Sequence, residues 1–387
     1  MILKSTYWLA LSYFTYFFCY GVFLPFWSDW LKGEGLAADA IGLLLGAGLV
    51  ARFVGSLTIA SSVKNSARLI FALRGLGLLA LTFSVGFWLG DAWLWLLLVM
   101  VGFNLFFAPL VPLTDALAAV WQRQIAMDYG KVRVWGSIAF VIGSAVTGEL
   151  VDIWGHPAIL AILSAGLAAM VLGMLLRPSV MPAASVSCAR SAAVTPWRRL
   201  LREPAVWRFL LCVSLLQGAH AAYYGFSVIY WKSEGYSAAA IGYLWSLGVA
   251  AEIVVFTFSR RLFQRWSARS LLLLSAICGV VRWALMGSTI ALPGLIVIQI
   301  LHCGTFTVCH LAAMRFIAAR TDGDVLRLQA VYSALALGGS IALMTVVSGF
   351  LFEHLQRGTF WVMAALAVPA LFSLPPAGAR SAADAQE

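Results

Sequence analysis

Apolar residues follow one another along this chain in long continuous runs, separated by short polar segments. A helix needs roughly 20 apolar residues to cross a bilayer, and by that measure the sequence predicts about twelve spans. The first six are 6–31, 38–60, 68–89, 93–121, 129–154 and 157–177. The last six are 204–231, 238–260, 270–290, 293–319, 325–353 and 358–375. Several runs exceed the required length, so we expect tilted or kinked helices.

The composition agrees with this pattern. Hydrophobic residues make up 62% of the chain and charged residues 11%, with a mean hydropathy of +0.91. Soluble domains carry about 25% charged residues, so a soluble fold is excluded. The apolar runs are continuous and do not alternate, which excludes a β-barrel. The predicted fold class is an all-α membrane protein whose partner is the lipid bilayer.

The distribution of Lys and Arg residues indicates how the chain is oriented in the membrane. The formal net charge is +10, and most Lys and Arg residues between the apolar runs fall on one side of the predicted membrane. Only Lys32, Lys232 and Arg357 fall on the other side. Lys and Arg are enriched in cytoplasmic loops, so we expect both termini in the cytoplasm and no nucleic-acid partner.

A segment rich in Pro, Ser, Ala and Arg divides the chain. It predicts an N-terminal six-helix bundle at 1–177, a cytoplasmic linker at 178–203, a C-terminal six-helix bundle at 204–376 and a cytoplasmic tail at 377–387. Such composition favours a flexible linker over a packed element.

An internal repeat relates the two halves. Lys32–Gly42 reads KGEGLAADAIG, and Lys232–Gly242, 200 positions later, reads KSEGYSAAAIG. Each piece lies just after the first helix of its half. Two parallel duplicates of six helices are typical of major facilitator transporters, which bind substrate near the bilayer midplane. The same offset aligns Arg52 with Glu252, so equivalent mid-helix positions carry opposite charges.

Charged residues inside apolar runs are the candidate functional residues, because charge is costly in lipid and usually faces a protein interior or an aqueous cavity. Arg52 and Glu252 either line a central cavity or form a structural pair. Asp115 and Arg133 either face that cavity or snorkel to the cytoplasmic surface. Glu252 is also a candidate proton carrier.

Further along the chain, Arg282 lies deep in its span and His302 deep in the next one. A guanidinium binds a carboxylate bidentately, and an imidazole can titrate near neutral pH. His220 and His310 are weaker candidates. No metal-binding, cofactor-binding or catalytic motif appears, so we expect no metal, no cofactor and no enzymatic activity.

The first span, with YFTYFFCYGVFLPFW, and the seventh, with AYYGFSVIYW, are rich in aromatic residues on every face. Many aromatic residues in membrane proteins are interfacial or pack between helices. An aromatic cavity with fixed cations would instead suit an aromatic carboxylate. The candidate stacking residues are Phe18, Phe26, Tyr223 and Tyr224.

The opening helix, Tyr16–Leu31, resembles that of lactose-permease-like proton symporters of the major facilitator superfamily. PLTDA followed by YGKVRVWG resembles the segment that binds substrate in that family, which implies binding roles for Asp115 and Arg133. VVRWALMGS through LHCGTF resembles the pair of helices that carries the proton-coupling arginine and histidine, which implies coupling roles for Arg282 and His302.

The chain departs from that family's pattern in the acids. Thr305 stands where a glutamate is expected one turn after the histidine, and Val249 stands where another is expected, with Glu252 one turn further on. The eleventh span has no lysine near Gly338–Gly339, and Lys64 replaces the acid of a loop motif. The proton path of the sugar symporters is therefore not intact.

Several dispersed runs, among them STYWLALSYFTYFF, GFNLFFAPLVPLTDALA and LHCGTFTVCHLAAMR, resemble the phenylpropionate permease family. This resemblance implies an inner-membrane permease of a Gram-negative bacterium. We expect uptake of 3-phenylpropionate or a related aromatic acid by proton symport, with a monomer as the working unit.

On this hypothesis Arg133 binds the substrate carboxylate, with Arg52 or Arg282 as alternatives. Asp115 orients Arg133 or bonds to substrate, while Glu252 and His302 carry the proton. Two other functions stay open: symport of a sugar or nucleoside, and a membrane sensor or assembly partner that transports nothing.

Overall fold

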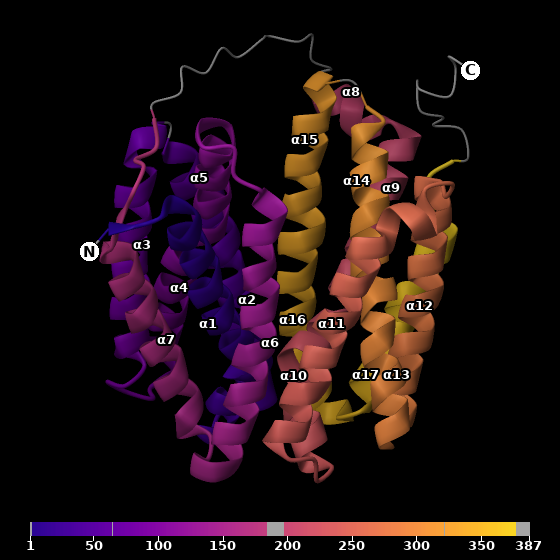
Figure 1. Ribbon diagram of the computed structural model, residues 1–387. Helices are drawn as coiled ribbons and strands as arrows, with labels where there is room; N and C mark the ends of the chain where they lie inside the picture. Colours follow the sequence, from indigo (N-terminus) through magenta and orange to yellow (C-terminus); the bar gives the residue numbers. More distant parts are fainter. Residues whose placement is uncertain (1, 64, 184–196, 321, 377–387) are drawn as a thin grey trace. The chain divides into compact units, whose positions relative to one another are not determined.

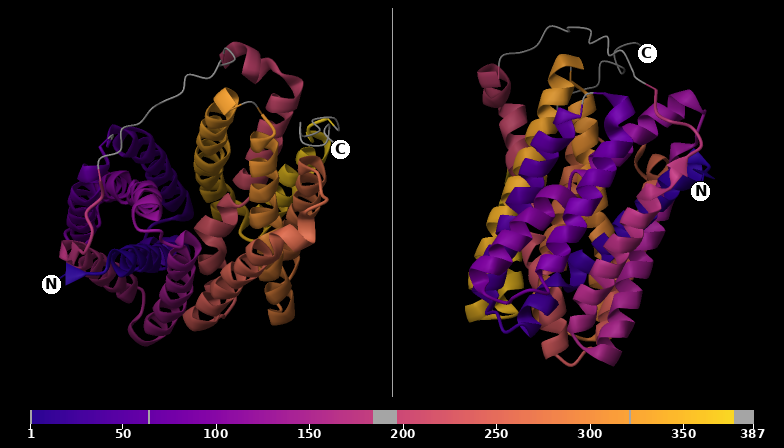
Figure 2. Two further views of the ribbon diagram at one scale, coloured as in Figure 1. Left: turned by 45° about the horizontal axis from the view of Figure 1, so that its top comes forward. Right: turned by 90° about the vertical axis from the view of Figure 1, so that its left-hand side faces the viewer.

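The structure, a computed structural model, describes residues 2–63, 65–183, 197–320 and 322–376, and these residues are almost entirely helical (Figure 1). Lipid offers no hydrogen-bonding partners, so a chain in the bilayer satisfies its backbone groups within helices. Two strands, β1 (Ile2–Leu3) and β2 (Arg177–Pro178), pair in parallel, and β1 lies at the N-terminal label in Figure 2. The predicted tail, 377–387, and residues 184–196 of the predicted linker lie outside the described residues, as does Lys64.

The first half of the chain contains the elements α1 (Ser5–Gly33), α2 (Ala38–Gly55), η1 (Ser56–Ala60), η2 (Ser66–Arg68), α3 (Leu69–Gly86), α4 (Trp93–Phe107), α5 (Leu110–Gln124), α6 (Tyr129–Trp154) and α7 (Pro157–Leu175). The second half begins with α8 (Trp197–Arg202), α9 (Pro204–Gly218), α10 (Ala221–Ser233), α11 (Ala238–Phe263), α12 (Ala268–Ser288) and α13 (Leu292–His302). It continues with η3 (Cys303–Thr307), α14 (Val308–Ala318), α15 (Asp322–Tyr332), η4 (Ser333–Ser340), α16 (Ile341–Leu355) and α17 (Gly358–Phe372).

The helices follow the predicted spans closely. Within the described residues, 11 helical segments are long and apolar enough to cross a membrane, and each coincides with a predicted span. The twelfth prediction, 358–375, coincides with the shorter apolar helix α17 of 15 residues. The chain is therefore a multi-pass α-helical membrane protein, as the hydropathy pattern predicts.

Two of the spans are broken in the middle. The fourth is interrupted at Ala108 and Pro109, between α4 and α5. Proline removes a backbone donor and crowds the preceding turn, so Pro109 explains this interruption. The seventh is interrupted at Ala219 and His220, between α9 and α10. There the His220 backbone N–H bonds to Gln217 O, and the Leu216 carbonyl is bonded by the His220 ring instead.

The described chain packs as two compact units. One comprises the described residues of 1–187 together with Gly225–Ser246, and the other comprises the described residues of 188–224 and of 247–387. The segment Gly225–Ser246 belongs to the second half by sequence, yet it packs in the first unit.

Helix α1 organises the first unit by packing against α6 and α7. Gly21 and Gly143 allow the backbones of α1 and α6 to meet: a Cβ at Gly21 would lie 2.4 Å from Phe140 O, and one at Gly143 would lie 2.5 Å from Phe18 O. Small residues at helix crossings are the usual way for membrane helices to gain close packing.

Aromatic rings fill the space between α1 and α4. Tyr16 stacks on Phe107 with ring centroids 4.4 Å apart, and Phe107 stacks on Phe103 at 5.0 Å. Phe23 and Trp27 extend this contact along α1. Much of the aromatic run of the first span is therefore packing between helices.

The segment Gly225–Ser246 is held to α1 and α6 by polar contacts. The Asp152 carboxylate accepts hydrogen bonds from the first two backbone N–H groups of α11, Ala238 at 2.8 Å and Ala239 at 2.9 Å. Carboxylates stabilise helix N-termini, where N–H groups lack partners within the helix. Lys232 and the buried Asp29 form an ion pair at 2.9 Å.

Arginines hold several helix C-termini. Arg74 donates to Met174 O and Leu176 O at the end of α7, and Arg208 donates to Phe372 O at the end of α17. A cation at a helix C-terminus satisfies carbonyls that have no partner within the helix and complements the helix dipole.

The described ends of the predicted linker are ordered by local contacts. Gln124 at the end of α5 bonds to Met181 O and to Ala183 N. On the other side of the gap, α8 forms a short helix, and Glu203 pairs with Arg320 at 2.6 Å.

Candidate functional site

The predicted site residues fall into two clusters, one in each unit. Arg52, Asp115 and Arg133 lie in the first unit, on α2, α5 and α6. Arg282, His302 and Glu252 lie in the second, on α12, α13 and α11.

Arg133 lies on an aromatic surface in the first turns of α6. Its guanidinium carbon is 4.3 Å from the centroid of the Phe17 ring and 5.3 Å from that of Tyr13. Within the described residues the guanidinium has no hydrogen-bond acceptor and no ion-pair partner. The face of the cation is therefore occupied by rings, while its N–H edge is open to a ligand.

Asp115 does not pair with Arg133. Its Oδ1 accepts hydrogen bonds from two phenols, Tyr13 at 2.5 Å and Tyr129 at 3.2 Å. Tyr13 therefore connects the two charges, because its hydroxyl bonds to Asp115 and its ring lies under Arg133. Tyr13, Phe17 and Tyr129 contact these two charges and are not among the candidate residues that the sequence analysis named. Tyr13 and Phe17 stand among many aromatic residues of the first span, and the rotation of each helix, which the sequence does not give, decides which rings face the charges.

Arg52 lies over the Tyr20 ring at 5.0 Å and beside Tyr16. Its Nη1 is buried without a hydrogen-bond partner. Within the first unit, Arg52 is thus a second cation that rings surround.

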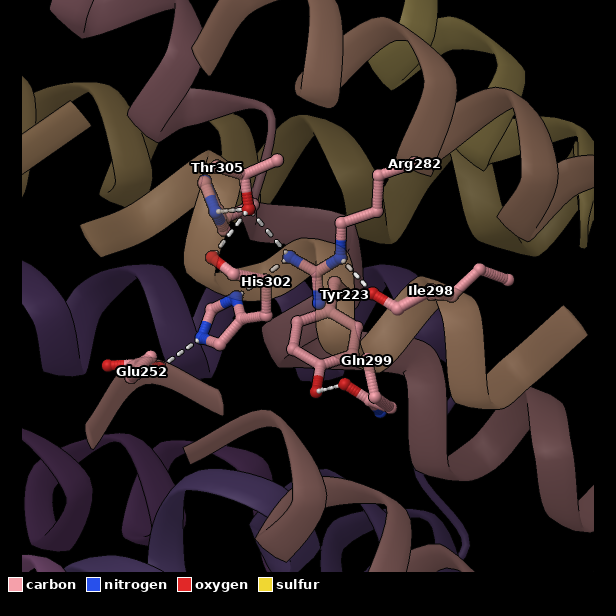
Figure 3. A network of polar contacts seen from close by, with 8 residues as sticks. Tyr223, Glu252, Arg282, Ile298, Gln299, His302 and Thr305 are labelled. Atoms are coloured by element: carbon pink, nitrogen blue, oxygen red, sulfur yellow. Dashed lines mark hydrogen bonds and ion pairs between the residues drawn. The ribbon is translucent and has the colours of Figure 1, made fainter. Parts of the chain in front are cut away.

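The second cluster centres on a short contact between a carboxylate and an imidazole that sequence spacing alone did not reveal. Glu252 Oε1 lies 2.7 Å from His302 Nε2 (Figure 3). The carboxylate that the family resemblance places one turn after the histidine is thus supplied from α11. His302 ends α13, and the π-helical turn η3 follows at once. Such turns are rare and occur frequently at functional sites.

Arg282 connects the other members of the second cluster. It is fully buried, and its Nε donates to Ile298 O at 2.9 Å (Figure 3). Its Nη1 donates to Thr305 Oγ1 at 3.0 Å and lies 2.8 Å from His302 Nδ1. Its Nη2 is buried without a hydrogen-bond partner. The Tyr223 and Trp283 rings each lie 4.5 Å from the guanidinium carbon.

Thr305 explains how the cluster tolerates the loss of a glutamate at that position. Its hydroxyl accepts from Arg282 and lies 3.0 Å from His220 Nε2. A second acid here would leave two carboxylates against one arginine in a buried place, where unpaired charge is costly. With a neutral Thr305, Glu252 and Arg282 balance each other.

The predicted stacking residues lie in different surroundings. Tyr223 is fully buried and donates to Gln299 Oε1 at 2.9 Å, and Tyr224 stacks against His220 with centroids 5.5 Å apart. In the first unit, Phe26 is fully buried, and the Phe18 ring lies against Gly166 of α7. The structure thus brings Tyr223 and Tyr224 to the second cluster, whereas Phe18 and Phe26 occupy helix-packing positions.

Among the residues that the structure describes, no group of three His, Cys, Asp or Glu side chains is arranged to hold a metal ion. What the two clusters can do is bind an anion at an open guanidinium and hold a proton at a partly buried carboxylate.

Comparison with known proteins places these clusters in a transporter. The model of the MFS_1 like family matches residues 6–363. A probable 3-phenylpropionic acid transporter of Escherichia coli K12 is 64% identical over 375 residues, which cover 97% of this chain and 98% of the relative. A maltose permease of Geobacillus stearothermophilus is 25% identical over 362 residues, covering 91% of this chain and 89% of the relative.

Solved structures share the architecture. The nucleoside transporter NupG matches with a TM-score of 0.77 at 17% identity, covering 96% of this chain and 98% of that one. A bacterial homolog of the human lysosomal transporter Spinster, in an inward-facing and unoccupied conformation, matches with a TM-score of 0.69 at 13% identity, covering 95% of each chain. At these identities the likeness shows the fold alone.

Proposed function

The chain belongs to the MFS_1 like family, and from that premise we propose that it takes up 3-phenylpropionate or a related aromatic carboxylate across the bacterial inner membrane. The fold is that of the major facilitator transporters, and the relatives are transporters, not enzymes. In the proposal the chain works as a monomer with both termini in the cytoplasm, divided into the bundles 1–177 and 204–376.

One observation carries the substrate class: the Arg133 guanidinium, with its face on Phe17 and its N–H edge without an acceptor. A carboxylate accepts two hydrogen bonds from such an edge. The rings of Phe17 and Tyr13 beside it offer contact to an aromatic group. The 64% identical relative is named a probable 3-phenylpropionic acid transporter, and 3-phenylpropionic acid has both a carboxylate and an aromatic ring.

The remaining roles follow from the two clusters. Asp115, fixed by Tyr13 and Tyr129, keeps Tyr13 under Arg133. Arg52 and Arg282 are the alternative anchors for the carboxylate, since each has a buried N–H group without a partner. Coupling to protons takes place at Glu252 and His302, because a partly buried carboxylate beside an imidazole can change its protonation during transport.

The test is uptake of labelled 3-phenylpropionate into membrane vesicles, with and without an imposed pH gradient. We expect a pH gradient to drive accumulation, and Arg133→Ala to lower uptake by about 10- to 150-fold, since hydrogen bonds to charged groups contribute about 1.5–3 kcal/mol. Arg123→Ala, at an exposed arginine of α5, is the matched control. Wild-type uptake in Arg133→Ala would remove Arg133 from the site.

Symport of a sugar is the second candidate, because one relative over most of the chain is named a maltose permease. Competition separates the two candidates. Inhibition of uptake by maltose and not by aryl acids would favour the sugar.

A further inference from the structure

A basic surface lies where α11 ends and the turn to α12 begins. The segment 260–269 contains four arginines, and no Asp or Glu occurs in the sequence 253–321. Arg260, Arg261 and Arg265 are exposed, and within the described residues none of their guanidinium groups has a hydrogen-bond or ion-pair partner. Positive charge is therefore concentrated here without a described counter-ion.

Stabilisation of the C-terminus of α11 does not account for these arginines. Cations near a helix C-terminus often satisfy its last carbonyl groups. In this helix a different residue has that role, because Arg315 of α14 donates to Phe263 O at 2.7 Å and also to Trp266 O. The guanidinium groups of Arg261 and Arg265 are therefore available to a ligand.

An exposed apolar face of α11 leads up to the basic surface. Val254, Phe258 and Arg261 are spaced four and three residues apart, so they lie on one face of the helix. Val254 is 55% exposed and Phe258 is 45% exposed. The opposite side of α11 faces the protein interior, since the Phe256 ring lies 6.4 Å from the His310 ring of α14. The outer face thus combines an apolar stripe with a cation at its end.

Trp266 indicates the depth of this surface in the membrane. It directly follows Arg265, is 42% exposed, and packs edge-on against Phe263 with ring centroids 5.7 Å apart. Tryptophan is enriched at the membrane–water interface, where the lipid headgroups lie. Arginine side chains near helix ends also extend their charged groups to that level. The guanidinium groups of Arg261 and Arg265 are therefore placed among headgroups, with Val254 and Phe258 deeper along the helix.

We propose that Arg261 and Arg265 bind the phosphate of an anionic phospholipid, whose acyl chain lies along Val254 and Phe258. A guanidinium binds phosphate oxygens bidentately, and anionic lipids attract basic segments beside a membrane span. An acidic soluble protein would match the charge but not the apolar face that continues into the membrane. The inference does not depend on the substrate proposed above.

The test titrates the purified full-length protein in detergent with phosphatidylglycerol, which is anionic, in competition with the zwitterionic phosphatidylcholine. Native mass spectrometry measures how much of each lipid is bound. We expect the wild type to prefer phosphatidylglycerol by about 10-fold or more. The double variant Arg261→Gln/Arg265→Gln should bind it about 30-fold more weakly, since each arginine near an anionic surface strengthens binding by about 5-fold.

The matched control is Arg260→Gln/Arg123→Gln, which removes the same charge at two exposed positions. It should weaken the binding of phosphatidylglycerol by about 5-fold at most, because only Arg260 is close to the surface and it lies on a different side of α11 from Phe258.

A second measurement locates the lipid in the wild-type protein. In nanodiscs, hydrogen–deuterium exchange of the segment 256–266 should be slower with phosphatidylglycerol than with phosphatidylcholine, because a bound headgroup stabilises the end of α11 against local opening. Equal exchange in the two lipids would contradict a site at this end of the helix.

Four binding results would overturn the proposal. Equal binding of the two lipids by the wild type would leave an acidic protein as the partner that matches the charge. Unchanged binding in Arg261→Gln/Arg265→Gln, or an equal loss in the control variant, would remove these two arginines from the site. Displacement of the lipid by glycerol 3-phosphate would assign them to a soluble phosphate compound. Absence of aryl-acid uptake would contradict the proposed function and leave the lipid site standing.

Discussion

Arg133 and Arg282 are the same side chain used in opposite ways. Arg282 is fully buried, and its Nε and Nη1 donate to Ile298 O, His302 and Thr305. Arg133 is half-buried and has aromatic faces as its only described partners. A guanidinium whose donors are used within the protein fixes its neighbours, whereas one with a free edge is available to a ligand. Exposure and hydrogen-bond partners therefore distinguish Arg282 from Arg133, which we propose as the first choice for binding the substrate carboxylate.

The largest effect that tests this difference is on stability. We expect Arg282→Met to cost about 3–5 kcal/mol of unfolding free energy, because it leaves the partly buried Glu252 without a countercharge and His302 without a donor. Arg133→Met should cost less than about 1 kcal/mol, since it breaks no hydrogen bond. Urea unfolding of both variants in detergent measures the difference. Equal destabilisation by the two substitutions would contradict it.

The next largest effect should come from Tyr13 and Tyr129, the two tyrosines that donate hydrogen bonds to Asp115 in the first cluster. Tyr13→Phe removes the short hydrogen bond to Asp115, and Tyr129→Phe removes the longer one. We expect about 1.5–3 kcal/mol of lost stability for Tyr13→Phe and less for Tyr129→Phe, with a raised KM for aryl acid in the first variant. Thermal unfolding and uptake kinetics measure both. If Tyr129→Phe has the larger effect, Tyr13 is not the connection between Asp115 and Arg133.

A smaller effect should come from Gly136, which leaves space for the Arg133 side chain. A Cβ there would lie 2.7 Å from Phe17 Cδ2 and 2.8 Å from Arg133 Nη1. The Phe17 ring and the Arg133 side chain must both shift, so we expect Gly136→Ala to cost about 1–3 kcal/mol and to raise the KM for 3-phenylpropionate. Gly130→Ala, whose Cβ would be 3.5 Å from its nearest neighbour, is the control. Equal KM values in the Gly136→Ala and Gly130→Ala variants would show that Gly136 does not affect substrate binding.

The smallest effect should come from Asp128, which precedes the helix that carries Tyr129 and Arg133. The Lys131 backbone N–H donates to its carboxylate at 3.3 Å and lowers the pKa of Asp128. A lowered pKa means that the contribution to stability is present above the unfolded value, about 3.9, and is lost as the pH falls through the folded value.

Asp128→Ala should therefore lower the melting temperature slightly at pH 7, and the difference from wild type should vanish in acid. Melting curves in detergent across the pH range measure this. A difference that persists below about pH 3 would assign the effect to something other than the carboxylate.

Hydropathy was enough to predict the spans, because few structures satisfy the backbone hydrogen bonds of a chain in lipid. A backbone without water must be helical, and its length is set by the bilayer. The same logic makes charges inside apolar runs conspicuous, so Arg52, Asp115, Arg133, Glu252 and Arg282 are recognisable in the amino-acid sequence alone. The break at Pro109 has a local cause as well, because proline lacks a backbone donor and cannot continue the hydrogen bonding of the preceding turn.

The partners of those charges were not predictable, because pairing depends on the rotation of each helix about its axis. Asp115 was expected to orient Arg133 or to bond to substrate, yet within the described residues its carboxylate bonds to Tyr13 and Tyr129. Glu252 is one turn away from the position that the family resemblance favours, yet it reaches His302 from a different helix.

The sequence by itself therefore determined that this protein is a multi-spanning transporter with fixed charges in its apolar helices. Only the tertiary structure decided which charges are satisfied within the protein and which are open. The physical reason is the difference in range: the hydrophobic pattern acts over a whole span, whereas a hydrogen bond is made or lost within an ångström.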